Sequence, residues 1–237
     1  MISKIPQVID NPWFLFMKTA EKILVVSLDL FNQRGESNVS SVDIALELDI
    51  SPGNLYYHFK GKEIIVAALF DLYKEQMDKV LTSALRETLT IEDFFYFLYL
   101  VLEKGHLFQF LYHNQANLAE NHPGVAKSFK KHLRAQEACI EKLLSHFIAN
   151  GSIKASAVQS LQIVEIIGLV FTQSANYYAL KGQSINDETH LYKGLAIILF
   201  AVLPYINLPQ GELHQLQEAI ATHSLVSGLV DEAPRTS

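Results

Sequence analysis

The chain has 237 residues and a formal net charge of −6, and 49% of its residues are hydrophobic whereas only 19% are charged. Such a composition predicts one or two packed domains and excludes a disordered protein. The acidic balance persists in the segment 18–63, where five basic and seven acidic residues give a net charge of −2, and it excludes a broad basic surface for nucleic acid.

Helix signals begin close to the N-terminus. The first helix pattern covers 19–34, where Thr19 can cap, apolar residues recur at three- and four-residue spacing, and Gly35 supplies a left-handed stop. A second, shorter pattern covers 41–48 and follows two serines whose hydroxyls can cap it. The sequence therefore predicts a long helix followed by a short one.

A third helix pattern covers 52–59 and begins three residues after the second ends. Ser51 offers a capping hydroxyl, and Pro52 suits the first helical position. Two short helices joined by so tight a turn form a helix-turn-helix, which places the start of its second helix in the major groove of DNA.

Longer helix patterns fill the rest of the chain, without the period-two alternation of strands. The fold class is therefore all-α, with a three-helix N-terminal domain and a helical C-terminal domain. The later helices are predicted over 62–88, 91–113, 123–150, 155–180, 188–205 and 212–225.

We predict a helix-turn-helix domain over 12–62 and a ligand-binding and dimerisation domain over 63–228. The ends, 1–11 and 229–237, are expected to be mobile.

A pattern of roughly 45 residues runs from Thr19-Ala-Glu-Lys-Ile-Leu through Val42-Asp-Ile-Ala to Ile50-Ser-Pro-Gly-Asn-Leu-Tyr-Tyr-His-Phe-Lys-Gly-Lys-Glu. This pattern resembles the DNA-binding domain of the TetR family of transcriptional regulators. It implies a homodimer that holds operator DNA and responds to a small molecule. The pattern over 110–129 is similar to a subgroup of bacterial repressors with its own C-terminal domain type, which implies no particular ligand.

The third helix pattern leaves a polar and aromatic row on the side opposite its apolar residues, which is unusual for a surface that faces only water. Gly53 permits a close approach to base edges, and Asn54 can pair with adenine. The resemblance implies that Tyr56 and Tyr57 contact the DNA backbone and thymine methyl groups. The predicted DNA-binding residues are Ser41, Ser51, Pro52, Gly53, Asn54, Tyr56, Tyr57, His58, Lys60 and Lys62.

Phosphate contacts are implied by the resemblance for Ser41, His58 and Lys62, with the amides at the start of the second helix assisting Ser41. Three alternatives stay open: Tyr56 can pack under the domain, His58 can cap locally, and Lys62 can be solvated.

Two positions depart from the family pattern. Val42 stands where relatives often have an arginine, which removes a base contact. Asp49 stands where the turn usually has glycine, so it must adopt a left-handed conformation, which Asp tolerates better than most residues.

Eight of the chain's aromatic residues lie between positions 94 and 112. They either line a ligand pocket or form an ordinary aromatic core. Asparagines that follow at helical spacing can face the same pocket or solvate a short connecting helix. The predicted pocket residues are Phe94, Phe97, Phe108, Tyr112, Asn117 and Glu165.

Two strongly apolar segments, 161–171 and 195–206, are too hydrophobic for a monomer surface. They resemble the four-helix dimer interface of the family, in which Gly168 would permit close crossing. Glu165 either pairs across this interface, meets a ligand, or is simply exposed. The predicted interface residues are Ile163, Ile167, Gly168, Phe171, Leu195, Ile198, Leu199 and Val202.

The sequence thus predicts a cytoplasmic regulator, most simply a repressor released from operator DNA when a small apolar molecule binds. The N-terminus lacks a secretion signal, the longest apolar run is too short to span a bilayer, and one cysteine, Cys139, excludes an intramolecular disulfide. No cofactor, metal or membrane partner is expected, and no catalytic motif indicates an enzyme. The alternative is a protein-interaction or lipid-carrier module that keeps the fold without binding DNA.

Overall fold

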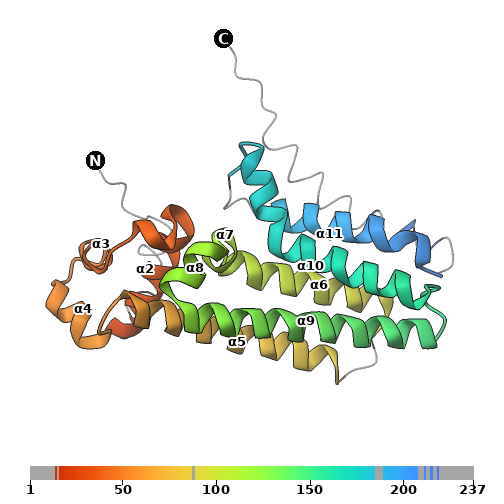
Figure 1. Cartoon of the computed structure of the whole chain (residues 1–237), viewed down its shortest axis with the longest axis horizontal. Helices are drawn as coiled ribbons and strands as arrows, with labels where there is room; N and C mark the ends of the chain where they lie inside the picture. The colour runs from red at the N-terminus through yellow and green to blue at the C-terminus, as the bar shows by residue number, and fades with distance from the viewer. Residues whose placement is uncertain are drawn as a thin grey trace, which may run out of the picture. The chain divides into compact units, whose positions relative to one another are not determined.

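The computed structural model describes residues 14, 16–86, 89–184 and 189–207, and the isolated positions 211, 214, 215 and 218. Within these residues the elements are α-helices, 3-10 turns and an isolated bridge between Ile153 and Ile206, which confirms the all-α class (Figure 1). The predicted mobile ends and most of the predicted last helix lie outside the described residues.

The chain divides into two compact units. Unit 1 comprises residues 1–75 and 108–130, and unit 2 comprises residues 76–107 and 131–237. The functional boundary predicted after residue 62 stays a prediction, because packing and function need not divide a chain at the same point.

Unit 1 begins with three helices, α2 (Thr19–Arg34), α3 (Ser41–Glu47) and α4 (Pro52–His58), and a 3-10 turn, η2 (Glu36–Asn38), between α2 and α3. All three predicted helices are confirmed to within one residue at each end. Their apolar faces pack together, and the buried side chains are Ile23, Val26, Leu30, Phe31, Ile44, Ala45 and Leu55.

The ends of α2 agree with the sequence at one side only. Gly35 ends α2 with a φ of 80°, a positive value that favours glycine, while its ψ of 139° differs from that of a left-handed helical residue. Thr19, however, is the first helical residue and not the cap. Lys18 occupies the cap position, and its backbone N–H donates to the Glu21 carboxylate at 3.0 Å.

The rest of unit 1 is built around aromatic side chains from the start of α5 (Lys62–Ala84) and the start of α9 (Pro123–Ala149). Tyr73 and Tyr112 share a buried hydrogen bond of 2.6 Å between their hydroxyls. The ring of Phe129 lies 5.0 Å from that of Tyr112. Such edge-to-face contacts add to the stabilisation from area burial alone.

The helix predicted over 91–113 is interrupted. The structure has α6 (Ile91–Leu107), then two turn residues, then the single helical turn α7 (Phe110–His113). The backbone N–H of Phe110 donates to the side chain of Asn32 at 3.1 Å, which replaces the helical bond four residues back. A further short helix, α8 (Gln115–Asn121), links α7 to α9.

In unit 2, α11 (Thr189–Val202) packs against α6 and α10 (Ala157–Leu180), and α10 and α11 run side by side (Figure 1). The turn η3 (Leu203–Tyr205) ends α11 earlier than predicted. Gly194 permits this packing, since a Cβ there would lie 3.3 Å from Val170 Cγ1. Close crossing therefore depends on Gly194 within the subunit.

Candidate DNA-binding site

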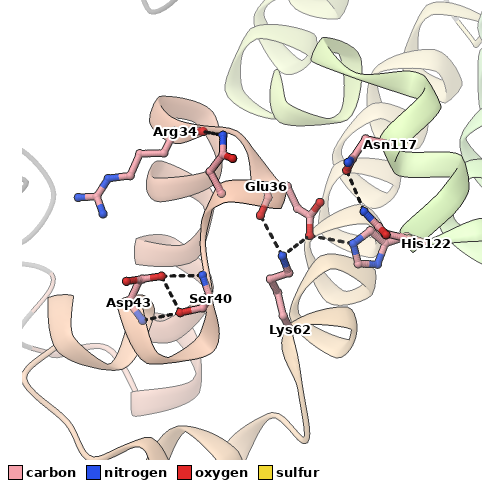
Figure 2. Close-up of polar contacts among 9 residues, drawn as sticks. Arg34, Glu36, Ser40, Asp43, Lys62, Asn117 and His122 are labelled. Atoms are coloured by element: carbon pink, nitrogen blue, oxygen red, sulfur yellow. Dashed lines mark hydrogen bonds and ion pairs between the residues drawn. The ribbon is translucent and has the colours of Figure 1, made fainter.

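The first element of the candidate site is α3, whose start is fixed by a capping box. The Ser40 hydroxyl accepts from the Asp43 N–H at 3.2 Å, and the Asp43 carboxylate accepts from the Ser40 N–H at 2.8 Å (Figure 2). The hydroxyl and backbone N–H of Ser40 hold the pKa of Asp43 below its ordinary value. Because Ser40 is the cap, Ser41 becomes the first helical residue and is half-buried.

The turn between α3 and α4 has the geometry that the sequence requires. Asp49 has φ of 54° and is the one non-glycine residue with positive φ among those described. The Ile50 N–H donates to the Ala45 carbonyl at 3.0 Å, and the Asp49 N–H donates to the Leu46 carbonyl at 3.2 Å. These two bonds form a Schellman motif, which fixes the direction in which the chain enters α4.

The recognition face of α4 is solvent-exposed. Ser51 caps the helix by accepting from the Asn54 N–H at 3.1 Å, and Pro52 occupies the first turn, as predicted. Tyr56 and Tyr57 are 57% and 76% exposed, so neither packs under the domain. The remaining exposed positions of this face are Gly53, Asn54 and His58.

Lys62 is placed differently from the expectation. Its ammonium lies 2.8 Å from the Glu36 carboxylate and donates to the Glu36 carbonyl at 3.0 Å (Figure 2). Lys62 is therefore paired within the chain and is not simply solvated, and its predicted phosphate contact stays a prediction. Sequence inspection missed Glu36, because its position 26 residues before Lys62 gives no local signal.

Few cations remain on this surface. Lys60 is the only lysine or arginine in the segment 40–61. Its ammonium lies 4.8 Å from the centre of the Tyr56 ring, a cation–π distance. Arg34 is engaged with Glu47, at 3.7 Å. The low positive charge expected from the sequence is thus lowered further by internal pairing.

Two aliphatic side chains on α3 are exposed beside this row. Val42 is 51% exposed and Leu46 is 70% exposed. Val42 was expected only to remove a contact, and Leu46 was not predicted to lie at the site. Both lie off the buried stripe of α3, and this spacing is the signal by which they can be found. Aliphatic groups at such positions suit thymine methyl groups.

Known protein families match both parts of the chain. The pattern described as "Bacterial regulatory proteins, tetR family" matches residues 23–69, and the TetR pattern described as "Bacterial transcriptional repressor" matches residues 72–212. The second match alone covers more than half of the chain. The chain belongs to the TetR family.

A solved TetR-family structure agrees with this assignment, and a second solved structure shares the fold. A TetR-family regulator from Marinobacter aquaeolei VT8 is 27% identical, with a TM-score of 0.76 over 87% of this chain and 99% of that one. The ketosteroid transcriptional regulator KstR2 of Mycobacterium tuberculosis is 15% identical, with a TM-score of 0.63 over 81% and 96%. The second likeness shows the fold alone.

A curated relative matches a shorter segment. The "Probable HTH-type transcriptional regulator YttP" of Bacillus subtilis is 34% identical over 68 residues. The match spans 29% of this chain and 33% of the relative, so the chain matches only about a third of that relative's length.

The predicted pocket aromatics of this TetR-family chain are divided between the two units. Phe94 stacks with Phe97 at 6.4 Å within unit 2. Phe108 packs on Tyr73 at 5.7 Å within unit 1, and Tyr112 belongs to the same cluster. All four predicted residues are less than 8% exposed. This packing agrees with an aromatic core, one of the two alternatives that the sequence left open, and the pocket role stays a prediction.

The other two predicted pocket residues line separate hollows. Asn117, in unit 1, lines a hollow of about 150 Å³. Glu165, in unit 2, lines a groove of about 420 Å³ between α9 and α10. Glu137 contributes a second carboxylate to this groove, whose other lining is mostly apolar and includes no lysine or arginine.

The predicted dimer-interface residues are mostly internal. Gly168 and Phe171 are half-buried, and the other six predicted residues are buried inside the subunit: Ile163, Ile167, Leu195, Ile198, Leu199 and Val202. They pack within unit 2, because the most regular apolar stripe of each helix faces the subunit core.

The same two helices leave a second apolar face exposed. Its residues on α10 and α11 are Val158, Leu161, Leu169, Tyr177, Leu180, Ile197 and Phe200. Among the described residues, α10 alone is long and apolar enough to cross a bilayer, and little of it is buried in the chain. In a TetR-family protein this apolar, uncovered face suits a protein partner.

Proposed function

We propose that the chain is a cytoplasmic, ligand-responsive regulator that binds operator DNA through α4 as a homodimer and acts as a repressor. One observation carries the DNA-binding part: α4 presents Asn54 and Tyr57 to solvent from a capped, Schellman-linked helix-turn-helix. The packing against α3 is completed by Leu55, so the exposed row is available for base edges. No catalytic role is proposed.

Selection from a pool of random double-stranded DNA tests this proposal. We expect enrichment of an inverted repeat whose half-sites lie about one or two helical turns apart, because two recognition helices on a two-fold axis require it. Tyr57→Ala should lose the enrichment, whereas Tyr96→Ala, an exposed tyrosine of unit 2, should keep it. A pool without any enriched sequence would instead favour the interaction-module alternative.

For the effector, we propose the groove between α9 and α10 as the binding site. Glu137 and Glu165 have no ion-pair partner among the described residues, and the walls around them are mostly apolar. An apolar molecule with a cationic head would match both the apolar walls and the two carboxylates. A carboxylic acid would be repelled by the negative charge of Glu137 and Glu165. The proposed effector is therefore still mostly apolar, as the sequence predicts, and it also carries a cationic head group.

The effector site is tested by thermal unfolding with octyltrimethylammonium and with octanoate. The cation should raise the melting temperature in a concentration-dependent manner, and octanoate should not. Glu137→Gln and Glu165→Gln should each weaken the effect, while Glu141→Gln, an exposed α9 residue outside the groove, should leave it intact. Equal shifts for both probes would contradict the assignment.

A further inference from the structure

A buried carboxylate sits at the entrance to the helix-turn-helix. Glu36, in η2, is 8% exposed, and its Oε1 atom receives two partners. The Lys62 ammonium lies 2.8 Å away and the His122 Nε2 atom lies 2.9 Å away. Figure 2 shows both side chains pointing to this carboxylate. We name these three residues the triad.

The triad is ionic. Burial raises the pKa of Glu36, but hydrogen bonds and charges from Lys62 and His122 outweigh it and hold that pKa below its usual value. Glu36 is therefore a carboxylate, and its oxygen can only accept, so His122 Nε2 is a donor. Removing one member of a buried charged cluster leaves the others unpaired, so it lowers the stability of the fold more than the loss of a surface ion pair does.

The triad connects the two ends of the helix-turn-helix segment with the junction between α8 and α9. Glu36 precedes α3 and Lys62 is the first residue of α5, so their contact closes the segment 37–61 that carries α3 and α4. His122 lies between α8 and α9, where it ends the first helix and its carbonyl accepts from the Ala126 N–H of the second. All three belong to unit 1.

Packing beside the triad is incomplete. The hollow of about 150 Å³ is lined on one side by Glu36 and its neighbours in η2 and on the other by α7 and α8, including Asn117 and Leu118. Van der Waals contact between η2 and α7–α8 is therefore interrupted next to Glu36. The link between these elements depends more on the ion pairs than it would in a filled core.

We propose that Glu36 and His122 are positioning residues for DNA binding: they hold both ends of the recognition segment 37–61 against the α8–α9 junction. A shift of that junction would then change the placement of α4 without any contact between the junction and DNA. This inference rests on the proposed DNA-binding function. It also implies that Lys62 pairs with Glu36 in the triad and does not contact a DNA phosphate.

Hydrogen exchange of the full chain tests the triad without DNA. His122→Ala and Glu36→Gln should exchange faster over residues 41–58, while His122→Gln, whose amide N–H can replace Nε2, should stay near the original chain. Ile198→Val lowers stability from unit 2 and serves as the control, with little change over 41–58 expected. Unchanged exchange in both disrupted variants, or the same increase in the control, overturns the proposal.

Operator affinity supplies the second readout. His122→Ala should weaken binding about tenfold, a size typical of coupled sites, with His122→Gln restoring it.

Lys62→Ala should weaken binding while leaving the salt dependence unchanged. A salt slope reduced by about one per subunit would make Lys62 a phosphate contact and overturn the assignment. If the original chain itself binds no DNA, the proposed function fails, and hydrogen exchange still decides on the triad.

Discussion

Asp49 occupies a left-handed position, with φ of 54°, at which an L-residue with a Cβ is strained. Asp49→Gly should therefore raise the free energy of unfolding, by about 0.5 kcal/mol after the greater entropy of glycine in the unfolded chain is included. Urea unfolding measures the change. The matched control is Asp71→Gly, on the exposed side of the α5 helix, which should lower stability instead. A loss of stability in Asp49→Gly would contradict the Schellman turn.

The Asp43 carboxylate contributes to stability in a defined pH range. Hydrogen bonds from the Ser40 hydroxyl and backbone lower the pKa of Asp43 in the folded chain below the ordinary value of 3.8. A lowered folded pKa means that the contribution is fully present above the unfolded pKa and is lost as the pH falls through the folded pKa.

Asp43→Asn should accordingly reduce the free energy of unfolding at pH 7, by about 0.5–1 kcal/mol for a charge at an exposed helix start. The difference from the original chain should shrink below pH 4 as Asp43 becomes protonated. Denaturant titrations at both pH values measure it. A difference that stays constant with pH would show that the charge of Asp43 is not the cause.

Residue roles were predictable where the cause is local. The left-handed turn at Asp49 and the cap at Ser51 follow from a few neighbouring residues, and both are present. The pairing of Lys62 was not predictable, since its partner Glu36 lies 26 residues earlier in the chain. The second partner of Glu36, His122, is 86 residues from it. A lysine at a helix start has the same sequence context whether it meets phosphate or a buried carboxylate.

Helix limits were likewise predictable where capping residues or glycine mark them. The break between α6 and α7 was not, because it depends on Asn32 of α2, which supplies the acceptor for the Phe110 N–H. The sequence also could not predict which face of α10 and of α11 is buried in the subunit. Both helices are apolar around much of their circumference, so periodicity alone does not distinguish the buried face from the exposed one.

At the scale of elements, we propose the exposed face of α10 and α11 as the dimer interface. Leu169→Asp and Phe200→Asp place a charge on this face and should shift the chain towards monomers in sedimentation velocity, because each buries an unpaired carboxylate. Helical content should be retained, since both side chains are exposed in the subunit.

The control for the interface is Leu85→Asp, an exposed leucine elsewhere in unit 2. It should sediment as the original chain does. Ile198→Asp, at an internal position, should instead unfold the subunit. A dimer that survives both Leu169→Asp and Phe200→Asp would place the interface on another surface.

At the scale of the whole molecule, the acidic charge predicts weak salt dependence of DNA binding. The net charge is −6, and internal pairing of Lys62 and Arg34 leaves few cations near α4. Each neutralised phosphate contributes about 0.9 to the slope of log affinity against log salt, so we expect a slope below about 3 per subunit. Fluorescence anisotropy between low and moderate salt measures it. A much steeper slope would contradict this account, because it would require a basic DNA-contacting surface beyond the one formed by α3 and α4.

The central claim is that α4 reads base sequence, and the most direct test is the ratio of affinities for the selected operator and a scrambled duplex. Asn54→Ala and Tyr57→Ala should lower this ratio by about 1–3 kcal/mol in free-energy terms, while Tyr96→Ala leaves it unchanged. The measurement uses fluorescence anisotropy at one fixed salt concentration. If Asn54→Ala and Tyr57→Ala both keep the full ratio, α4 is not the recognition helix.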